Sequence, residues 1–204
     1  MTVPFIFVID DQEAVRNALG EMLRVFGHRV QTYGSAESFL QAFSSTCSGC
    51  IVADVRMPGM DGIEFLRELA RRGICLPVVL ISGHADVPMA VAAIKAGAAD
   101  FIEKPINDTH LLTAINRSMA SYFDRLSRER TAEELRARVE RLTPREAEVM
   151  DLVVEGFTSH AIALRLNISQ RTVESYRVQI MDKMQAESVS VLVRQVIRLG
   201  RITP

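Results

Sequence analysis

Residues 5–11 of the chain read FIFVIDD, an apolar run that ends abruptly on two aspartates. A continuous run of aromatic and β-branched residues is typical of a strand that is buried on both faces of a parallel sheet. The segment lacks the basic residues and the longer apolar core of a secretory signal. We therefore expect a buried strand at residues 5–9, followed directly by a polar site.

Four more strand candidates, mostly runs of β-branched or aromatic residues, follow along the chain at residues 29–33, 51–53, 78–81 and 101–102. The segments between them carry apolar residues at helical spacing, so each connection is expected to be a helix. Strands that alternate with helices indicate βαβ units around a parallel sheet. The first part of the chain is therefore expected to fold as an α/β doubly wound domain with five parallel strands.

The composition is that of an ordinary globular protein with two small domains. Of 204 residues, 48% are hydrophobic and 24% are charged, and domains cluster near roughly 100 to 150 residues. No stretch approaches the roughly 20 apolar residues that span a bilayer, so we expect a cytoplasmic protein without a membrane partner. The three cysteines are too few for a disulfide framework, which agrees with a reducing compartment.

Beyond residue 115 no strand pattern recurs, and residues 124–141 mix both charge signs without glycine or proline. This composition predicts a solvated linker helix. An apolar stripe runs along it, with the members Ala132, Leu135, Val139 and Leu142. The stripe could pair with another helix or pack locally, and the sequence leaves both roles open.

A second domain is predicted to begin at Thr143. Thr143, Pro144 and Glu146 supply a capping hydroxyl, a proline at the first helical position and a glutamate at the third. The helix that begins there should end at Gly156, and three more short helices follow it. The chain thus divides into a first domain at residues 1–122, a helical linker at 123–142 and an all-α four-helix domain at 143–204.

Polar residues of the first domain stand where the expected strands end. They are Asp10 and Asp11 after the first strand, Asp54 after the third, Ser82 after the fourth and Lys104 after the fifth. The carboxyl ends of parallel strands share one edge of the sheet, so these side chains should converge. A single aspartate after a strand is more often a helix cap than a ligand, but the five residues together indicate a site.

Three carboxylates packed together repel one another unless a cation neutralises them, and an all-oxygen cluster suits a hard ion such as Mg²⁺. A lysine and a hydroxyl opposite them fit phosphoryl transfer, whose chemistry is mainly positioning and charge neutralisation. One aspartate could then act as the nucleophile. We therefore expect a phosphoryl-transfer site built on an aspartate and a magnesium ion.

These motifs resemble those of bacterial two-component response regulators of the FixJ type, which join a receiver domain to a LuxR/FixJ-type helix-turn-helix. The resemblance covers essentially the whole chain and rests on residues 10–11, 54–62, 82–84 and 100–105, which read DD, DVRMPGMDG, SGH and DFIEKP. It implies a flavodoxin-like receiver with strand order 2-1-3-4-5. It also implies a sensor histidine kinase, promoter DNA and RNA polymerase as partners.

The same resemblance implies roles for individual residues at the acidic edge. Asp54 would accept the phosphoryl group from the kinase. Mg²⁺, or Mn²⁺ in its place, would be held by Asp11, Asp54 and the backbone carbonyl of Arg56. Asp10 would act on the metal mainly through water.

A switch is implied as well. Ser82 and Lys104 would contact the phosphoryl oxygens, and Phe101 would turn inward as Ser82 moves. The fourth helix, fifth strand and fifth helix would then form a homodimer surface. The resemblance implies a transcription regulator rather than an enzyme, with at most slow loss of its own phosphoryl group, and FixJ-like relatives are commonly activators.

The third helix of the second domain has two distinct faces. Val173, Tyr176, Ile180 and Met184 form a stripe that suits burial, and Arg171, Glu174, Ser175 and Val178 lie opposite. A tight connection capped by Ser169 precedes this helix, as in a helix-turn-helix. The resemblance implies that Glu174, Ser175 and Val178 face base edges, and that Arg171, Thr172, Arg177 and Lys183 contact phosphates.

The second domain departs from many relatives at two places. They carry Asn-Lys where this chain has Ser159 and His160, and a histidine where it has Tyr176. Residues 143–204 hold eight Lys or Arg against seven Asp or Glu. Because phosphate contacts supply most of the affinity for DNA, so weakly charged a domain should need dimerisation on phosphorylation to bind well.

Two other functions stay open. One is an aspartyl-phosphate phosphohydrolase, although the sequence offers no second acid for turnover. The other is a regulator that dimerises constitutively through the linker stripe and needs no phosphorylation. Cys47 and Cys50 have the Cys-x-x-Cys redox spacing but no second pair for zinc, and the four histidines show no ligand spacing.

Overall fold

The computed structural model describes residues 3–44, 47–83 and 86–201. The chain divides into two compact units, Met1–Asp124 and Arg125–Pro204, and each is described by itself. The division falls inside one long helix, α5 (Asp108–Val139). No helix of the described residues is both long and apolar enough to cross a membrane.

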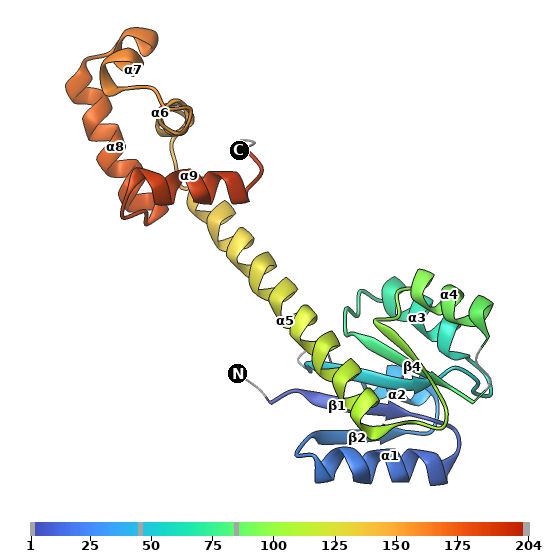
Figure 1. Ribbon diagram of the computed structural model, residues 1–204. Coiled ribbons are helices and arrows are strands. Elements are labelled where there is room, and N and C mark those ends of the chain that lie inside the picture. The colour runs from blue at the N-terminus through green and yellow to red at the C-terminus, as the bar shows by residue number, and fades with distance from the viewer. Residues whose placement is uncertain (1–2, 45–46, 84–85, 202–204) are drawn as a thin grey trace. The chain divides into compact units, whose positions relative to one another are not determined.

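The first unit is built on one parallel sheet (Figure 1). Its described strands are β1 (Phe5–Ile9), β2 (Arg29–Tyr33), β3 (Gly49–Asp54), β4 (Val78–Ser82) and β5 (Asp100–Glu103). They lie in the order β2-β1-β3-β4-β5, and all neighbouring pairs are parallel. Every residue of β3 and β4 is buried, as their continuous apolar sequences predict. The predicted fold class and strand order are confirmed.

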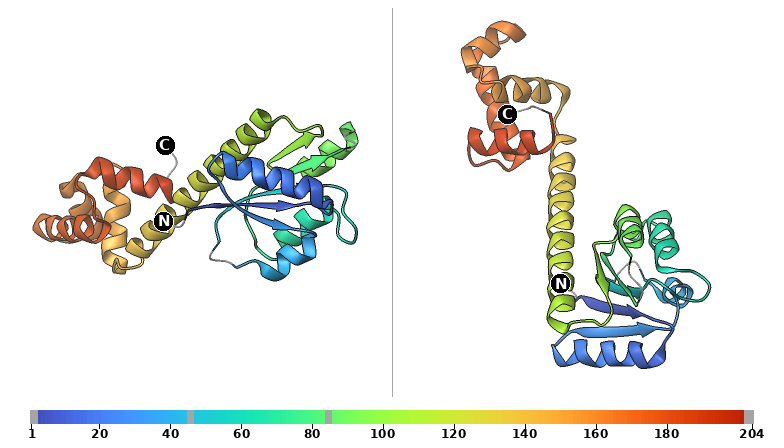
Figure 2. Two further views of the ribbon diagram at one scale, coloured as in Figure 1. Left: turned by 90° about the horizontal axis from the view of Figure 1, so that it is seen from below. Right: turned by 45° about the vertical axis from the view of Figure 1, so that its right-hand side comes forward.

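Helices cover both faces of this sheet, as Figures 1 and 2 show. They are α1 (Glu13–Val25), α2 (Ala36–Ala42), α3 (Gly62–Arg71), α4 (Val87–Lys95) and the first part of α5. Alternate strand residues supply two separate cores. Phe7 packs with Phe39 of α2 and Phe65 of α3, whereas Val8 packs with residues of α1 and α5 such as Leu23. Packing on both faces thus positions the carboxyl ends of β1, β3 and β4 side by side at one edge of the sheet.

The second unit is helical throughout its described residues. It contains α6 (Pro144–Val154), α7 (Ser159–Leu166), α8 (Gln170–Met184) and α9 (Val189–Arg198). The predicted capping box is present, because the Thr143 hydroxyl accepts from the backbone of Glu146 and the Glu146 side chain accepts from the backbone of Thr143. Asn167 ends α7 in the left-handed conformation with φ of 53°. This turn sets α8 against α7 as a helix-turn-helix requires.

The linker stripe lies within the second unit, where Leu135 is buried and the other three members are half-buried. Leu135 is only 3% exposed, and Val139 and Leu142 pack against the core that α6, α8 and α9 share. Of the two roles that the sequence left open for this stripe, the structure favours local packing. An apolar face that its own domain already covers offers little surface for a second helix.

Candidate functional site

Three buried polar side chains mark the carboxyl edge of the sheet. Asp10 directly follows β1 and is fully buried, Asp54 ends β3 with 4% exposure, and Ser82 ends β4 with 1% exposure. Lys104 follows β5, and its backbone N–H donates to the Ser82 carbonyl over 2.8 Å. Four of the five residues that the sequence singled out therefore lie together at this edge.

Lys104 joins the two buried aspartates. Its Nζ lies 2.6 Å from Asp54 Oδ1 and 3.0 Å from Asp10 Oδ2. The other Asp54 oxygen, Oδ2, accepts the backbone N–H of Arg56 over 2.7 Å. Burial acts to lower the pKa of Lys104, but the hydrogen bonds to the two carboxylates outweigh it and raise that pKa, so the ammonium stays charged.

Asp10 sits in the least solvated position of the group. Burial raises the pKa of its carboxyl group above the ordinary value, and hydrogen bonds from Lys104 and from the Gln12 backbone oppose that rise only in part. Two carboxylates thus share one ammonium. The edge keeps an acidic excess that a further cation would relieve.

Asp11 differs from the expected arrangement. Its side chain is exposed, and no group of three His, Cys, Asp or Glu side chains within the described residues is arranged to hold a metal. In this structure only Asp10 and Asp54 of the three carboxylates are buried at the edge, and the role of Asp11 as a metal ligand stays a prediction. Residues leaving a strand alternate in direction, so Asp10 turns into the sheet edge and Asp11 turns to solvent. The donor chemistry still fits Mg²⁺, since it comprises carboxylate oxygens beside an exposed backbone turn at Arg56.

The switch residues lie next to the acidic edge. Ser82 Oγ is 3.7 Å from Met89 Sδ on α4, and Phe101 of β5 is half-buried against the core beneath α4. Gly83 follows Ser82, and His84, the last residue of that motif, lies outside the described residues. Ser82 and Phe101 therefore lie on neighbouring strands, and Ser82 also contacts α4.

Two residues of the DVRMPGMDG motif are structural. Asp61 caps α3 by accepting the backbone N–H groups of Ile63 and Glu64. Gly62 allows α3 to approach β3 closely, because a Cβ there would lie 2.7 Å from the Asp54 carbonyl oxygen. These two residues thus fix where α3 begins after the loop that follows Asp54.

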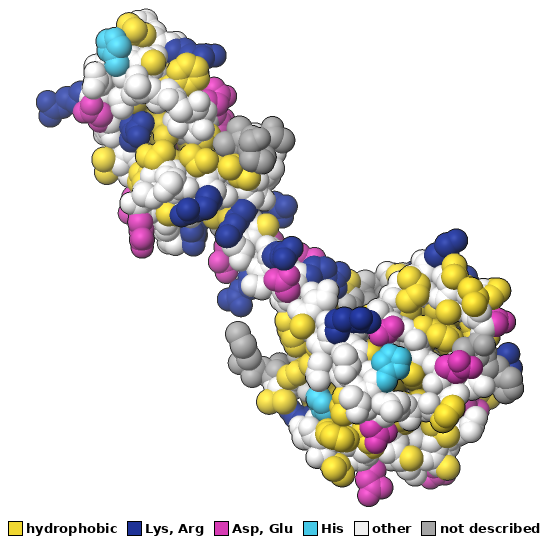
Figure 3. Space-filling model, in the orientation of Figure 1, with side chains coloured by type: hydrophobic (Ala, Val, Ile, Leu, Met, Phe, Trp, Pro, Cys, Tyr) yellow, Lys and Arg dark blue, Asp and Glu magenta, His cyan; other side chains and the backbone are white. Residues whose placement is uncertain are grey.

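The exposed face of α8 presents the residues that the resemblance placed toward DNA. Val173, Ile180 and Met184 are buried, as their stripe predicted, and Tyr176 is half-buried. On the other side Arg171, Glu174 and Ser175 are exposed, and Val178 is 70% exposed. Ser169 caps the helix by accepting the Thr172 N–H. Basic and acidic side chains are interspersed over the face of the second unit that Figure 3 shows.

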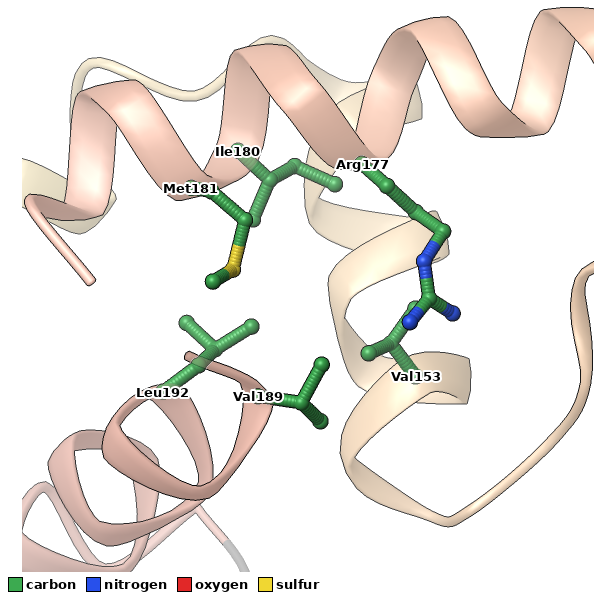
Figure 4. Close-up of a pocket in the computed structure, with 6 residues that line it drawn as sticks. All are labelled: Val153, Arg177, Ile180, Met181, Val189 and Leu192. Atoms are coloured by element: carbon green, nitrogen blue, oxygen red, sulfur yellow. The ribbon is translucent and has the colours of Figure 1, made fainter. Parts of the chain in front are cut away.

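Lys183 and Arg177 were expected to contact phosphates, and in the structure both lie beside other protein groups. Lys183 Nζ lies 2.6 and 2.8 Å from the two carboxylate oxygens of Glu146, which is 3% exposed. Arg177 lines a cavity of about 30 Å³ together with Val153 and Val189, and Figure 4 shows its guanidinium directed toward Val153. Both side chains lie at the borders of the buried face of α8. Contacts of Arg171, Thr172, Arg177 and Lys183 with DNA phosphates stay a prediction, and Lys183 would have to leave Glu146 to make one.

The Cys-x-x-Cys pair has no redox geometry. Cys47 packs on the core beneath α2 and α3, whereas Cys50 belongs to the opposite core, and both are free thiols. Burial raises the pKa of the Cys50 thiol to about 12. A thiolate, which is the reactive form, is thus disfavoured there.

Comparison with known proteins identifies both units. Residues 6–116 match the model of the response regulator receiver domain, and residues 140–196 match that of the bacterial regulatory proteins of the luxR family. The transcriptional regulatory protein FixJ of Bradyrhizobium diazoefficiens is 42% identical over 97% of this chain and 96% of its own length. FixJ of Rhizobium meliloti is 43% identical over 98% of both chains.

The chain belongs to the FixJ-type response regulators. Its structure is similar to that of the response regulator StyR, with a TM-score of 0.86 and 37% identity over 97% of this chain and all of that one. Full-length FixJ from B. japonicum gives a TM-score of 0.62 and 41% identity, with full coverage of both chains. This FixJ-type regulator is a two-component transcription regulator with a LuxR-type DNA-binding domain, and its relatives are regulators rather than enzymes.

Sequence reasoning missed two contacts that hold the acidic loops of this FixJ-type regulator. Arg16 Nη1 donates to the Asp10 carbonyl oxygen over 2.7 Å. Glu37 Oε1 accepts the Met60 N–H over 2.9 Å, in the loop between β3 and α3. Both are side-chain contacts to backbone atoms, six and 23 positions apart, and such contacts leave no pattern in a single sequence. In the sequence, Arg16 and Glu37 appear only as charged residues on expected helices.

Proposed function

We propose that Asp54 accepts a phosphoryl group from the phosphohistidine of a sensor kinase. The observation that carries this proposal is the pair of contacts on its carboxylate, Lys104 Nζ at 2.6 Å and Arg56 N at 2.7 Å. In the transfer a bond forms between a carboxylate oxygen of Asp54 and phosphorus, and the bond from phosphorus to the kinase nitrogen breaks. Charge neutralisation by fixed donors is what this reaction requires.

The remaining edge residues orient the group and balance its charge. Ser82 and Lys104 would contact the phosphoryl oxygens, and Lys104 would move from the carboxylate to the new dianion. Mg²⁺, or Mn²⁺, when bound neutralises charge on the transferred group. Asp11, Asp54 and the carbonyl of Arg56 would hold it, with Asp10 acting through water. Because Asp11 is exposed, its side chain has to turn toward the edge when the metal binds.

The proposed output is a homodimer formed through α4, β5 and α5. Three apolar side chains of α4 stand in solvent at a spacing of four and three residues, namely Val87 at 77%, Val91 at 45% and Ile94 at 51% exposure. Movement of Ser82 toward the phosphoryl group would let Phe101 turn inward, and would alter the packing of α4 on β5. An apolar stripe at helical spacing is suited to pairing once its shape is set.

Dimerisation would in turn raise the affinity for promoter DNA. A dimer makes twice as many phosphate contacts as a monomer. One DNA-binding domain needs this gain because its eight basic residues are nearly balanced by seven acidic ones. The proposed domains are a receiver at residues 1–122, a linker at 123–142 and a DNA-binding domain at 143–204. Bound at a promoter, the dimer would recruit RNA polymerase and activate transcription. Loss of the phosphoryl group by hydrolysis would be slow.

A constitutive dimer through the linker is the competing proposal. Burial of Leu135, and the packing of the half-buried Val139 and Leu142 against the core of the second unit, argue against it. The experiment treats the protein and its Asp54→Asn variant with acetyl phosphate and Mg²⁺, and follows mass and oligomeric state. We expect one added phosphoryl group and a dimer for the wild type, and neither for the variant. A dimer in both, without phosphorylation, would support the competing proposal.

A further inference from the structure

The exposed face of α8 combines one acid with one aliphatic side chain. Glu174 is exposed in the second turn, and Val178 stands one turn further along with 70% of its surface in solvent. Three other apolar residues of the same helix are buried to 1% or less, so the exposure of Val178 is an exception within α8. A surface that meets DNA phosphates would normally carry basic groups there.

The Glu174 carboxylate has a neighbour on its own helix. Gln170 Nε2 donates to its Oε1 over 2.9 Å, and Gln170 belongs to the first turn of α8. The residue is exposed, and an ionised carboxylate keeps further acceptor sites beside this one bond. An ionised carboxylate only accepts, so it is repelled by phosphates and by the N7 and O6 acceptors of guanine.

The edge of cytosine suits such an acceptor. In the major groove cytosine presents its N4 amino group as a donor, whereas adenine places the N7 acceptor beside its own amino group. The methyl groups of Val178 are complementary to the C5 methyl of thymine, the one apolar group on a base edge in that groove. Four residues of helix rise by about 6 Å, and base pairs are spaced by about 3.4 Å, so the two bases should be one or two steps apart.

We propose that Glu174 reads the amino group of a cytosine, and that Val178 reads the methyl group of a thymine one or two base pairs away, in each half-site of the operator. The inference rests on the proposed function, in that α8 is taken to enter the major groove. It adds the base preference, which comes from the chemistry of these two side chains. Ser175 lies between them in the sequence. Its hydroxyl can donate or accept a hydrogen bond, so it discriminates little between bases.

The test selects binding sites from a random pool of duplex DNA, with the full chain treated with acetyl phosphate and Mg²⁺. The wild type is expected to enrich half-sites with a cytosine and a thymine at that spacing. Glu174→Gln should move the preference at the cytosine position to adenine, because an amide matches the acceptor and donor of that base. The change should be roughly tenfold or more for a bidentate contact.

Val178→Ala and Glu155→Gln complete the set. Val178→Ala is expected to lose the thymine preference alone. Glu155 is an exposed carboxylate beyond the last turn of α6. Its replacement changes the net charge as Glu174→Gln does and should leave every base preference as in the wild type.

The possible outcomes separate this inference from the proposal on which it rests. Enrichment of guanine at the position that responds to Glu174, or an unchanged preference in Glu174→Gln, would overturn the base assignment while DNA binding stands. If the phosphodonor-treated wild type enriches no sequence at all, the proposed function itself fails.

Discussion

Lys104 Nζ lies 2.6 Å from Asp54 Oδ1 and so joins the end of β5 to the end of β3. The same ammonium is 3.0 Å from Asp10 Oδ2, and the lysine side chain is only 20% exposed. A single cation therefore balances two buried carboxylates. The acidic edge depends on it for its charge balance, and the proposed function also assigns it a contact with the phosphoryl group.

Lys104→Met is expected to destabilise the fold, since it leaves Asp10 and Asp54 close together and unpaired. We expect the free energy of unfolding near neutral pH, without divalent ions, to fall by about 1–3 kcal/mol. Urea unfolding followed by circular dichroism measures this. Lys95→Met, at an exposed position of α4, is the matched control and should change little. Equal unfolding midpoints for the two variants would contradict the charge-balance argument.

Gly62 is required for the close approach of α3 to β3. A Cβ at this position would lie 2.7 Å from the Asp54 carbonyl oxygen and 2.9 Å from Val55 Cα, both of them backbone atoms. Gly62→Ala should therefore lower the free energy of unfolding by roughly 1–3 kcal/mol. At Gly83 the nearest contact of an added Cβ is Lys104 Cδ at 3.9 Å. Gly83→Ala should be tolerated, and a similar loss in both variants in thermal unfolding would refute the packing account.

The ion pair between Glu146 and Lys183 should make the second unit sensitive to acid. Burial acts to raise the pKa of Glu146, but hydrogen bonds from Lys183 and Thr143 outweigh it and hold that pKa below its ordinary value of 4.5. The carboxylate therefore stabilises the fold fully above about pH 4.5, and this contribution is lost as the pH falls through the lowered pKa.

Glu146→Gln removes this contribution. We expect its free energy of unfolding to be about 1–3 kcal/mol below that of the wild type at neutral pH. The difference should persist down to about pH 5 and shrink below about pH 4.5, where the wild type also loses the charge. Urea titrations at several pH values measure it. A difference that grew in acid would have the opposite sign and would rule out the ion pair as its source.

Much of the fold follows from local sequence patterns. The ends of β1 and β2 match the apolar runs at residues 5–9 and 29–33, because Asp10 and Gly34 interrupt those runs. β3 begins two residues earlier than expected, at Gly49. The glycine is needed there because a Cβ would lie 1.8 Å from the Phe5 carbonyl oxygen, so its place in the strand depends on a neighbour 44 positions away.

The site was less predictable where it depends on side-chain direction. The convergence of Asp10, Asp54 and Lys104 follows from parallel topology, but the outward turn of Asp11 does not. The family resemblance implied that Lys183 contacts a phosphate. Its partner Glu146 lies 37 residues away on α6, and only the packing of the two helices brings them together.

The apolar stripe on α4 allows a direct test of the proposed dimer. Val91→Asp places a charge in the middle of a surface that also exposes Val87 and Ile94. We expect phosphorylation by acetyl phosphate to proceed as in the wild type. The dissociation constant of the dimer should rise at least tenfold, because a buried unpaired charge costs several kcal/mol. Analytical ultracentrifugation measures this. Val25→Asp, at an exposed apolar position of α1, is the control, and dimers of equal strength in both variants would contradict the assignment of the surface.

The central claim is that phosphorylation of Asp54 controls binding to DNA. The most direct measurement titrates a selected operator duplex with the full chain, with and without acetyl phosphate and Mg²⁺, for the wild type and for Asp54→Asn. Asparagine keeps the shape of the side chain but removes the nucleophilic carboxylate. We expect the phosphodonor to strengthen binding of the wild type to the duplex at least tenfold and to leave the affinity of the variant unchanged. Equal affinity in all four titrations would contradict it.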